Sequence, residues 1–302
     1  MEKLWLRKAS LLISHLNLFS LSFSYVITMK IGVVYFSGTG NTAKIGQIIS
    51  SKLSELSVQT DIINITPFND RKKILDFNEY DALVFGFPVY GSVIPSVCRD
   101  WLDTIKGENK HCAMFFTYGG PTMGIAHYHT KLLLNKQGFK ILASAEFLGK
   151  HSYNVAKGFN FLENRPNQDD FKVAEEYAIK LFEIFTKEKR EEIIFEKPEK
   201  ADSIMQRIQN KGKTVRKWVP TRNGKDCSMC RTCEESCPTN AFKADTGEAD
   251  KEKCINCMRC VTACSDEVID FNWDMTEIYE GLISHFEFTD EILMNLKSKI
   301  LI

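Results

Sequence analysis

The sequence predicts an α/β fold, with a doubly wound five-stranded parallel sheet followed by a small α+β domain. Two observations support this prediction. Short apolar runs alternate with helical patterns in the first half of the chain, and eight of the ten cysteines lie between residues 227 and 264. Continuous apolar strands separated by helices are typical of a parallel sheet that is covered on both faces. The 302 residues suffice for one large and one small domain.

The elements of the sheet follow from local hydrophobic patterns. Five apolar runs are expected to be strands: 31–36, 58–65, 82–87, 112–117 and 140–148. Helical stretches are expected between them, over residues 42–56, 94–105 and 123–137. An amphipathic helix is expected over 169–189, because its apolar residues recur every three or four positions. This helix would close the first domain.

Changes in composition divide the chain into five segments. We expect an N-terminal extension at 1–28, a first domain at 29–190, a charged linker at 191–221, a cysteine domain at 222–272 and a helical tail at 273–302. In the tail, Thr289 is expected to cap a short helix.

The N-terminal extension has basic residues ahead of an apolar stretch, which is similar to a secretory signal. Many serines interrupt this stretch, so a membrane span is disfavoured and no stable membrane insertion is expected. A cleaved signal and an upstream extension before a true start at Met29 both stay open. The cysteines between residues 227 and 264 point to metal rather than to disulfides. Sites of that kind normally need a reducing compartment for their assembly, which favours a cytoplasmic location.

The charge pattern limits the possible partners. Basic and acidic residues balance at 39 each, so no global field favours nucleic acid or an anionic membrane. Locally, seven basic residues and no acid lie between Ser203 and Lys225: Arg207, Lys211, Lys213, Arg216, Lys217, Arg222 and Lys225. This stretch is either a solvated linker face, a contact for a partner, or an intramolecular contact with the acidic cysteine domain.

The cysteines form two copies of one spacing, C-x2-C-x2-C-x3-C, beginning at Cys227 and at Cys254. This spacing is the bacterial ferredoxin run for iron–sulfur ligation, with Pro238 after the first copy and Ser265 in its place after the second. Zinc is the alternative, but structural zinc prefers two separated cysteine pairs. The isolated Cys98 and Cys112 are expected to be buried apolar residues.

By this repeat, residues 222–272 resemble two-[4Fe-4S] bacterial-type ferredoxins. In that class the fourth cysteine of each run binds the other cluster. The resemblance implies one cluster on Cys227, Cys230, Cys233 and Cys264, and another on Cys254, Cys257, Cys260 and Cys237.

The segment YFSGTGNT, residues 35–42, joins the first strand to the first helix and combines glycines with short hydroxyl side chains. Backbone N–H groups at a helix N-terminus, together with hydroxyl donors, suit a phosphate dianion. The segment has no lysine, so it is not a P-loop. The alternative is a plain connection between strand and helix.

Two further loops, GFPVYGSVIP (86–95) and TYGGPTMG (117–124), follow the third and fourth strands at the same sheet edge. Ligands of open α/β sheets bind at this edge. With these motifs, residues 31–150 resemble a flavodoxin, which implies FMN. Its phosphate would contact Ser37, Gly38, Thr39, Gly40, Asn41 and Thr42. Its ring would contact Pro88, Val89, Tyr90, Gly91, Thr117, Tyr118, Gly119 and Gly120.

Taken together, residues 29–272 resemble the flavodoxin–ferredoxin fusion proteins of anaerobic bacteria and archaea, the EFR1 family. The resemblance implies intracellular electron transfer between [4Fe-4S] clusters and FMN, with exchange with a ferredoxin or an oxidoreductase. One alternative is a reductase of a small substrate, with His151, Ser152 and Tyr153 over the flavin. The other is a redox-sensing binding protein. No G-x-G-x-x-G fingerprint for a nicotinamide cofactor is present.

Overall fold

The computed structural model describes residues 29–210 and 215–302. The predicted N-terminal extension, together with Lys211 and Lys213, lies outside the described residues. Within the described part, no helix is long and apolar enough to cross a membrane.

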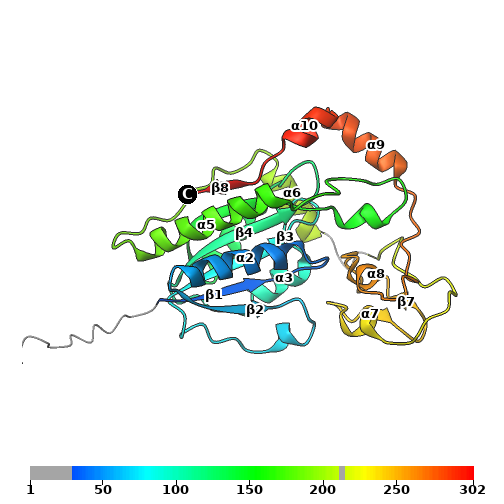
Figure 1. Cartoon of the computed structure of the whole chain (residues 1–302), viewed down its shortest axis with the longest axis horizontal. Helices are drawn as coiled ribbons and strands as arrows, with labels where there is room; N and C mark the ends of the chain where they lie inside the picture. Colours follow the sequence, from blue (N-terminus) through cyan, green and yellow to red (C-terminus); the bar gives the residue numbers. More distant parts are fainter. Residues whose placement is uncertain (1–28, 211–214) are drawn as a thin grey trace, which may run out of the picture.

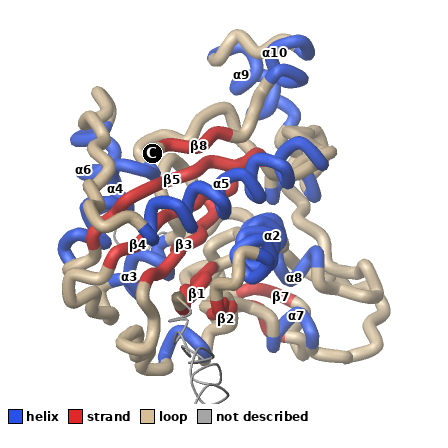
Figure 2. The backbone as a smooth tube through the Cα atoms, turned by 60° about the vertical axis from the view of Figure 1, so that its left-hand side comes forward, coloured by secondary structure: helices blue, strands red, loops and turns tan. Residues whose placement is uncertain are grey.

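A six-stranded sheet forms the centre of the first domain (Figures 1 and 2). Its strands are β1 (Lys30–Tyr35), β2 (Gln59–Asn64), β3 (Ala82–Pro88), β4 (His111–Tyr118), β5 (Lys140–Leu148) and β8 (Lys299–Leu301). The order is β2-β1-β3-β4-β5-β8, and the first five strands are parallel. The chain changes direction of winding between β1 and β3, as in a doubly wound sheet. The predicted α/β fold class and its five parallel strands are confirmed.

Helices cover both faces of the sheet. The helices α2 (Asn41–Glu55) and α5 (Gln168–Thr186) lie side by side on one face (Figure 1) and bury one apolar cluster with it. The helices α3 (Ser96–Leu102) and α4 (Ala126–Lys136) bury a second cluster on the other face. Cys98 and Cys112 belong to this second cluster with no exposed surface, as predicted. All five parallel strands therefore end at one edge, between two packed layers.

The C-terminal tail is only partly helical. It contains α9 (Thr276–His285) and α10 (Asp290–Asn295), and Thr289 caps α10 as predicted, accepting from the Ile292 N–H at 3.2 Å. The chain then returns to the first domain, where β8 pairs antiparallel with β5. The Ser298 hydroxyl accepts from Leu148 N at 3.0 Å and donates to the Asp170 carboxylate at 2.6 Å. The sequence interpretation missed this strand, because three residues carry too little pattern.

The segment expected to be a charged linker packs on the first domain. The Ile193 N–H donates to the Ile141 carbonyl oxygen at 2.8 Å, so the chain follows the sheet. The helix α6 (Ala201–Asn210) then buries Ala201 against Val93 and Ile125. The intramolecular use of the basic stretch is also observed: the Arg216 Nε donates to the Cys254 carbonyl oxygen at 3.1 Å.

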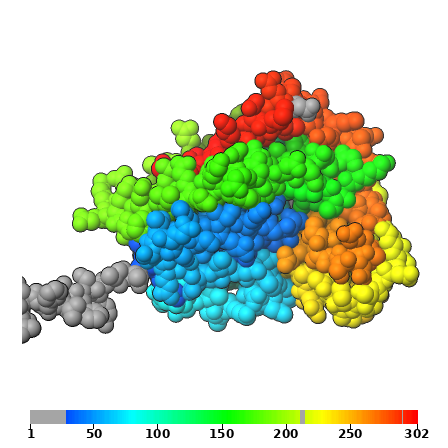
Figure 3. All heavy atoms as spheres, viewed as in Figure 1, coloured from blue at the N-terminus to red at the C-terminus, as the bar shows by residue number. Residues whose placement is uncertain are grey.

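The cysteine region is small and has little regular structure. It consists of α7 (Thr232–Glu235), β6 (Phe242–Lys243), β7 (Glu248–Ala249) and α8 (Arg259–Thr262). The first domain, in addition, has two 3₁₀ turns, η1 (Asp70–Lys72) and η2 (Ser152–Val155). Figure 3 shows the cysteine region, in yellow and orange, in direct contact with the blue and green atoms of the first domain. The cysteine region therefore meets the sheet edge at which the strands end.

Candidate functional site

A cleft of about 910 Å³ opens at the carboxyl edge of the parallel strands. This volume is within the range of pockets that bind cofactors and small ligands. Twelve of the fourteen residues predicted to bind FMN line it: Ser37, Gly38, Thr39, Asn41, Thr42, Pro88, Val89, Tyr90, Gly91, Thr117, Tyr118 and Gly119. Gly40 and Gly120 belong to the same loops but are not among the lining residues. The three loops that the sequence singled out are thus brought together.

The first loop presents free backbone donors at the start of α2. Gly40 has φ of +101°, a conformation that glycine adopts without strain, and this turns the chain into the helix. None of the hydrogen bonds between described residues uses the N–H groups of Gly38, Thr39, Asn41 or Thr42. Such N–H groups at a helix N-terminus fit a phosphate dianion.

Thr42 differs from its predicted role as a free hydroxyl donor. Its side chain is buried, and its hydroxyl forms a hydrogen bond of 2.7 Å with the Thr117 hydroxyl. Thr42 therefore connects the first loop to the loop after β4. Thr39 has no such bond among the described contacts, so it is the freer hydroxyl of the two.

The second loop is a tight turn that aims Tyr90 at the first loop. Tyr90 N donates to the Val93 carbonyl at 2.7 Å, and Gly91 lies in the left-handed region with φ of +60°. The carbonyl oxygen of Gly91, one of the predicted ring contacts, accepts from Arg207 of α6 at 3.3 Å. Burial raises the pKa of Tyr90 well above its ordinary value, and the Cys257 thiol adds to this effect.

Tyr118 lies deeper than the sequence suggests. It is 9% exposed and packs in the apolar cluster beneath the cleft, which it also lines. The adjacent Gly119 is in very close contact with the loop after β5. A Cβ atom there would lie 2.5 Å from both the Gly149 carbonyl oxygen and the His151 nitrogen.

The far wall of the cleft comes from outside the first domain. It includes residues of the loop before the second cysteine run, of α6 and of the tail: Arg207, Ile208, Arg216, Glu252, Lys253, Cys254, Ile255, Asn256, Trp273, Met275, Ile278 and Leu282. Sequence reasoning missed most of these residues. The motif at Cys254 was the one available signal, since a cluster that serves a flavin has to lie beside it.

His151, Ser152 and Tyr153 also line the cleft, from the segment after β5. Burial lowers the pKa of His151 to about 4, so its ring is neutral near pH 7. The Tyr153 N–H donates to His151 Nδ1 at 3.0 Å, which leaves the ring proton on Nε2. The neutral ring is a hydrogen-bond donor through Nε2, and it is poorly suited to deliver a proton.

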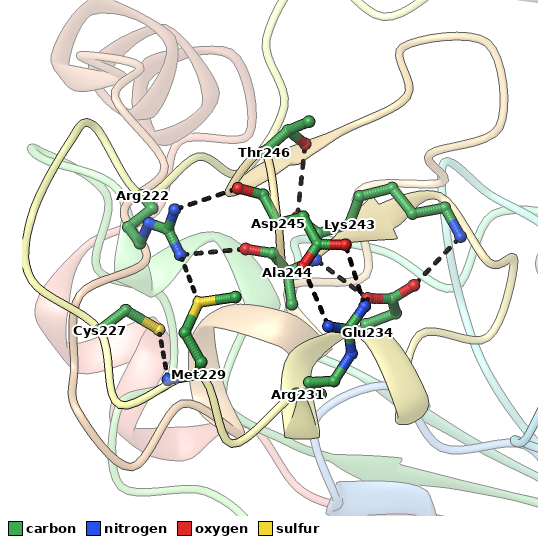
Figure 4. A network of polar contacts seen from close by, with 9 residues as sticks. All are labelled: Arg222, Cys227, Met229, Arg231, Glu234, Lys243, Ala244, Asp245 and Thr246. Atoms are coloured by element: carbon green, nitrogen blue, oxygen red, sulfur yellow. Dashed lines mark hydrogen bonds and ion pairs between the residues drawn. The ribbon is translucent and has the colours of Figure 1, made fainter.

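The eight cysteines of the repeat form two groups. We call Cys227, Cys230, Cys233 and Cys264 the outer cysteine group, because Cys230 is exposed and the four together line a small pocket. Figure 4 shows the polar network around this group. Arg231 forms ion pairs with Asp245 and Glu234 at 3.0 and 3.1 Å, and Arg222 donates to the Ala244 carbonyl oxygen at 3.0 Å. These contacts fix the loop that carries the outer group.

We call Cys237, Cys254, Cys257 and Cys260 the inner cysteine group. Cys237, Cys257 and Cys260 are buried, and Cys254 lines the cleft. Burial, followed by the neighbouring Cys257, Cys254 and Cys237, raises the pKa of the Cys260 thiol. These neighbours include Cys237 of the first run, as in the crossed ligand sets that the resemblance implies.

Both cysteine runs adopt the same unusual backbone. Met229 and Arg231 have φ of 58° and 60°, and the equivalent Asn256 and Met258 have φ of 53° and 60°. Left-handed non-glycine residues are uncommon, and a repeated set of them indicates a functional constraint. The N–H groups of Met229 and Asn256 both approach the preceding cysteine sulfur, at 3.3 and 3.4 Å. Such loops suit thiolates that are held around a cluster.

Among the described residues, no group of three histidine, cysteine or acidic side chains is placed to hold one metal ion.

Comparison with known proteins assigns the first domain. Residues 32–160 match the family model described as a flavodoxin domain. No curated protein matches the sequence.

Solved structures of similar fold include a flavodoxin from the domain Archaea, with 17% identity and a TM-score of 0.39 over 53% of this chain and 100% of the other. Flavodoxin 2 from Bacillus cereus has 19% identity and a TM-score of 0.39 over 51% and 98%. The Flv1 flavodiiron core from Synechocystis sp. PCC6803 has 17% identity and a TM-score of 0.40 over 54% and 37%. This chain thus spans little more than a third of the flavodiiron chain. The part of the chain in residues 32–160 is a flavodoxin-like domain, which supports FMN and flavin-linked electron transfer in general.

Proposed function

We propose that this protein transfers electrons between two [4Fe-4S] clusters and FMN, and exchanges them with a redox partner protein, as the resemblance to flavodoxin–ferredoxin fusions implies. Bound clusters would supply one-electron steps, and FMN would accept or donate one or two electrons. The observation that carries the proposal is the cleft itself. The predicted phosphate loop and Cys254 of the inner cysteine group line the same space.

Close packing supports a short path between the two parts. A Cβ atom on Gly38 would lie 3.2 Å from both Cβ and the carbonyl oxygen of Cys257, and 2.5 Å from the Tyr90 hydroxyl oxygen. A cysteine of the inner group and a residue of the predicted FMN loops therefore meet at Gly38. A side chain at this position would require the Tyr90 hydroxyl and the Cys257 backbone to shift, so the close approach favours glycine.

The position of the outer cysteine group supports exchange with a partner. Cys230 is exposed, and Met229 beside it is 41% exposed. The inner group is covered by the first domain on the side of the phosphate loop. A partner protein would therefore have access to the outer group first, and the proposed order is partner, outer group, inner group, FMN.

An anaerobic cofactor count tests the proposal. Protein that begins at Met29 should retain about eight irons, eight sulfides and one FMN per chain, by the two-cluster assignment. The double variant Thr39→Ala and Asn41→Ala should lower FMN retention. It removes the Thr39 hydroxyl and the Asn41 Nδ2 bond to the Lys150 carbonyl oxygen at 3.0 Å, which joins two walls of the cleft. Iron content should stay unchanged, because neither residue is one of the cysteines. Clusters without flavin in the wild-type protein would refute the electron-transfer proposal and favour redox sensing.

The extent of the cleft favours a second candidate function, reduction of a small substrate at the flavin. Beyond the predicted FMN loops the cleft continues between Arg207, Arg216, Ile278 and Leu282. If a substrate binds there, the neutral His151 would orient it through Nε2, and its proton would come from solvent. Anaerobic reoxidation of the reduced protein by small acceptors, compared in wild type and Ile278→Trp, tests this candidate: equal rates would exclude this part of the cleft.

A further inference from the structure

Two arginines cross the boundary between the first domain and the inner cysteine group in opposite directions. Arg71 of η1 donates through Nη2 to the carbonyl oxygen of Pro238, the residue after Cys237. Arg259 lies between Cys257 and Cys260 and donates through Nη1 to the carbonyl oxygens of Ser37 and Gly38, at 3.4 and 3.3 Å. Each part of the chain therefore contributes one cation to the same interface.

None of the ion pairs between described residues involves either of the two arginines, whose described hydrogen bonds go to backbone carbonyl oxygens. The other described hydrogen bonds of Arg71 go to the carbonyl oxygens of Ile65 and Thr66, at 2.8 and 2.6 Å. Both side chains are partly buried, and the Arg259 Nε is buried without an acceptor among the described residues. A backbone carbonyl has no net charge, so both cations still act on whatever lies beside them. Partial burial limits how far solvent screens them.

The outer cysteine group has a different electrostatic environment. Arg231, which follows Cys230 in the chain, is exposed and forms ion pairs with Asp245 and Glu234. Arg222 is the second cation that lines the outer pocket, and Asp266 lines the same pocket. Of the two outer cations, Arg231 is thus neutralised by carboxylates, whereas Arg222 donates to backbone carbonyl oxygens. Three arginines lie beside the inner group and form no ion pair among the described residues: Arg71, Arg216 and Arg259.

We propose that Arg71 and Arg259 are positioning residues that hold the inner cluster against the predicted phosphate loop, and that their charges raise its reduction potential above the value this buried cluster would otherwise have. This inference rests on the proposed function. Reduction adds one negative charge to a cluster, and nearby positive charge stabilises the reduced form, since net charge and exposure set these potentials. The two charges thereby favour the electron on the inner cluster, beside FMN. The same charges lie next to the loop that would bind the phosphate.

Redox titration of single variants tests the inference, with each cluster followed by EPR under anaerobic conditions. Arg71→Gln and Arg259→Gln should each shift the one-electron equilibrium between the clusters about tenfold toward the outer cluster. Tenfold corresponds to about 59 mV for one electron. The variants Arg71→Lys and Arg259→Lys keep the charge and lose the guanidinium geometry, so they should retain most of the wild-type potential.

Two controls define the outcome. Arg190→Gln removes an exposed cation that donates to His111 and should shift neither cluster. Arg231→Gln should shift the outer cluster alone.

Unchanged inner potentials in both glutamine variants, with full iron and FMN, would overturn the inference and leave the proposed function standing. Equal shifts in lysine and glutamine variants would also overturn it, because geometry rather than charge would then be responsible. Wild-type protein without iron would refute the proposed function itself.

Discussion

Replacement of Gly38 by alanine tests the contact between the two parts of the chain most directly. The new Cβ would lie 2.5 Å from the Tyr90 hydroxyl oxygen and 3.2 Å from the Cys257 Cβ and carbonyl oxygen. The tyrosine hydroxyl therefore has to move by roughly 0.7 Å to restore an ordinary contact, and the Cys257 backbone by a few tenths. Overpacking of this kind destabilises a protein by about 1–3 kcal/mol.

A double-mutant cycle separates the two neighbours. Tyr90→Phe removes the closest oxygen, so Gly38→Ala should cost about 0.5–1.5 kcal/mol less in the Tyr90→Phe background. The remaining cost reports the contact with Cys257. The assay is the free energy of unfolding from urea titration of the four proteins, with and without cofactors.

Gly281→Ala is the matched control for this cycle. Gly281 lies in the tail helix α9, and a Cβ there would meet nothing within 4 Å. The control should be neutral or slightly stabilising, because alanine is the better helix former. If Gly38→Ala were as stable as this control in both backgrounds, the two parts would not be in contact at Gly38 and the short path would be refuted.

Three further predictions concern other parts of the site. The pKa of His151 is about 4 in the folded state and near 6.5 in the unfolded state. Below pH 6.5 the unfolded state therefore binds more protons than the folded state. The free energy of unfolding should fall by about 2 kcal/mol from pH 7 to pH 5. His151→Asn, which keeps an acceptor for the Tyr153 N–H, should remove that loss in urea titrations at both pH values. Cys237→Ala should abolish the inner cluster and leave about four irons per chain, by the crossed ligand sets; iron analysis and EPR showing loss of the outer cluster instead would reverse those sets. Ser298→Ala should cost about 1–3 kcal/mol, because it leaves the buried Leu148 N–H without its acceptor; a stability equal to wild type would mean that the tail does not anchor β5.

The parallel sheet, the three loops at its edge and the repeat of cysteine spacings could all be predicted from the sequence. These features depend on local patterns: continuous apolar strands, glycine where the chain turns into a helix, and sulfurs at fixed intervals. The strand bounds of β3 and β5 were predicted to within one residue because each is a buried apolar run. The binding of FMN phosphate to the first loop and the crossed ligation of the clusters stay predictions.

The contact between the first domain and the cysteine region could not be predicted in this way, because it depends on how the folded parts pack. The Arg259 hydrogen bonds to the phosphate loop join residues more than two hundred positions apart, and no local pattern encodes such a contact. The same holds for β8, whose three residues form a strand because the edge of β5 offers unpaired backbone groups. Charge gave a partial signal: an intramolecular contact was one of the three interpretations of the basic stretch, and Arg216 makes such a contact through a backbone carbonyl. The two cysteine runs have the same spacing, so the sequence does not show which cysteine group lies next to the cleft. The packing of the cysteine region on the first domain decides this.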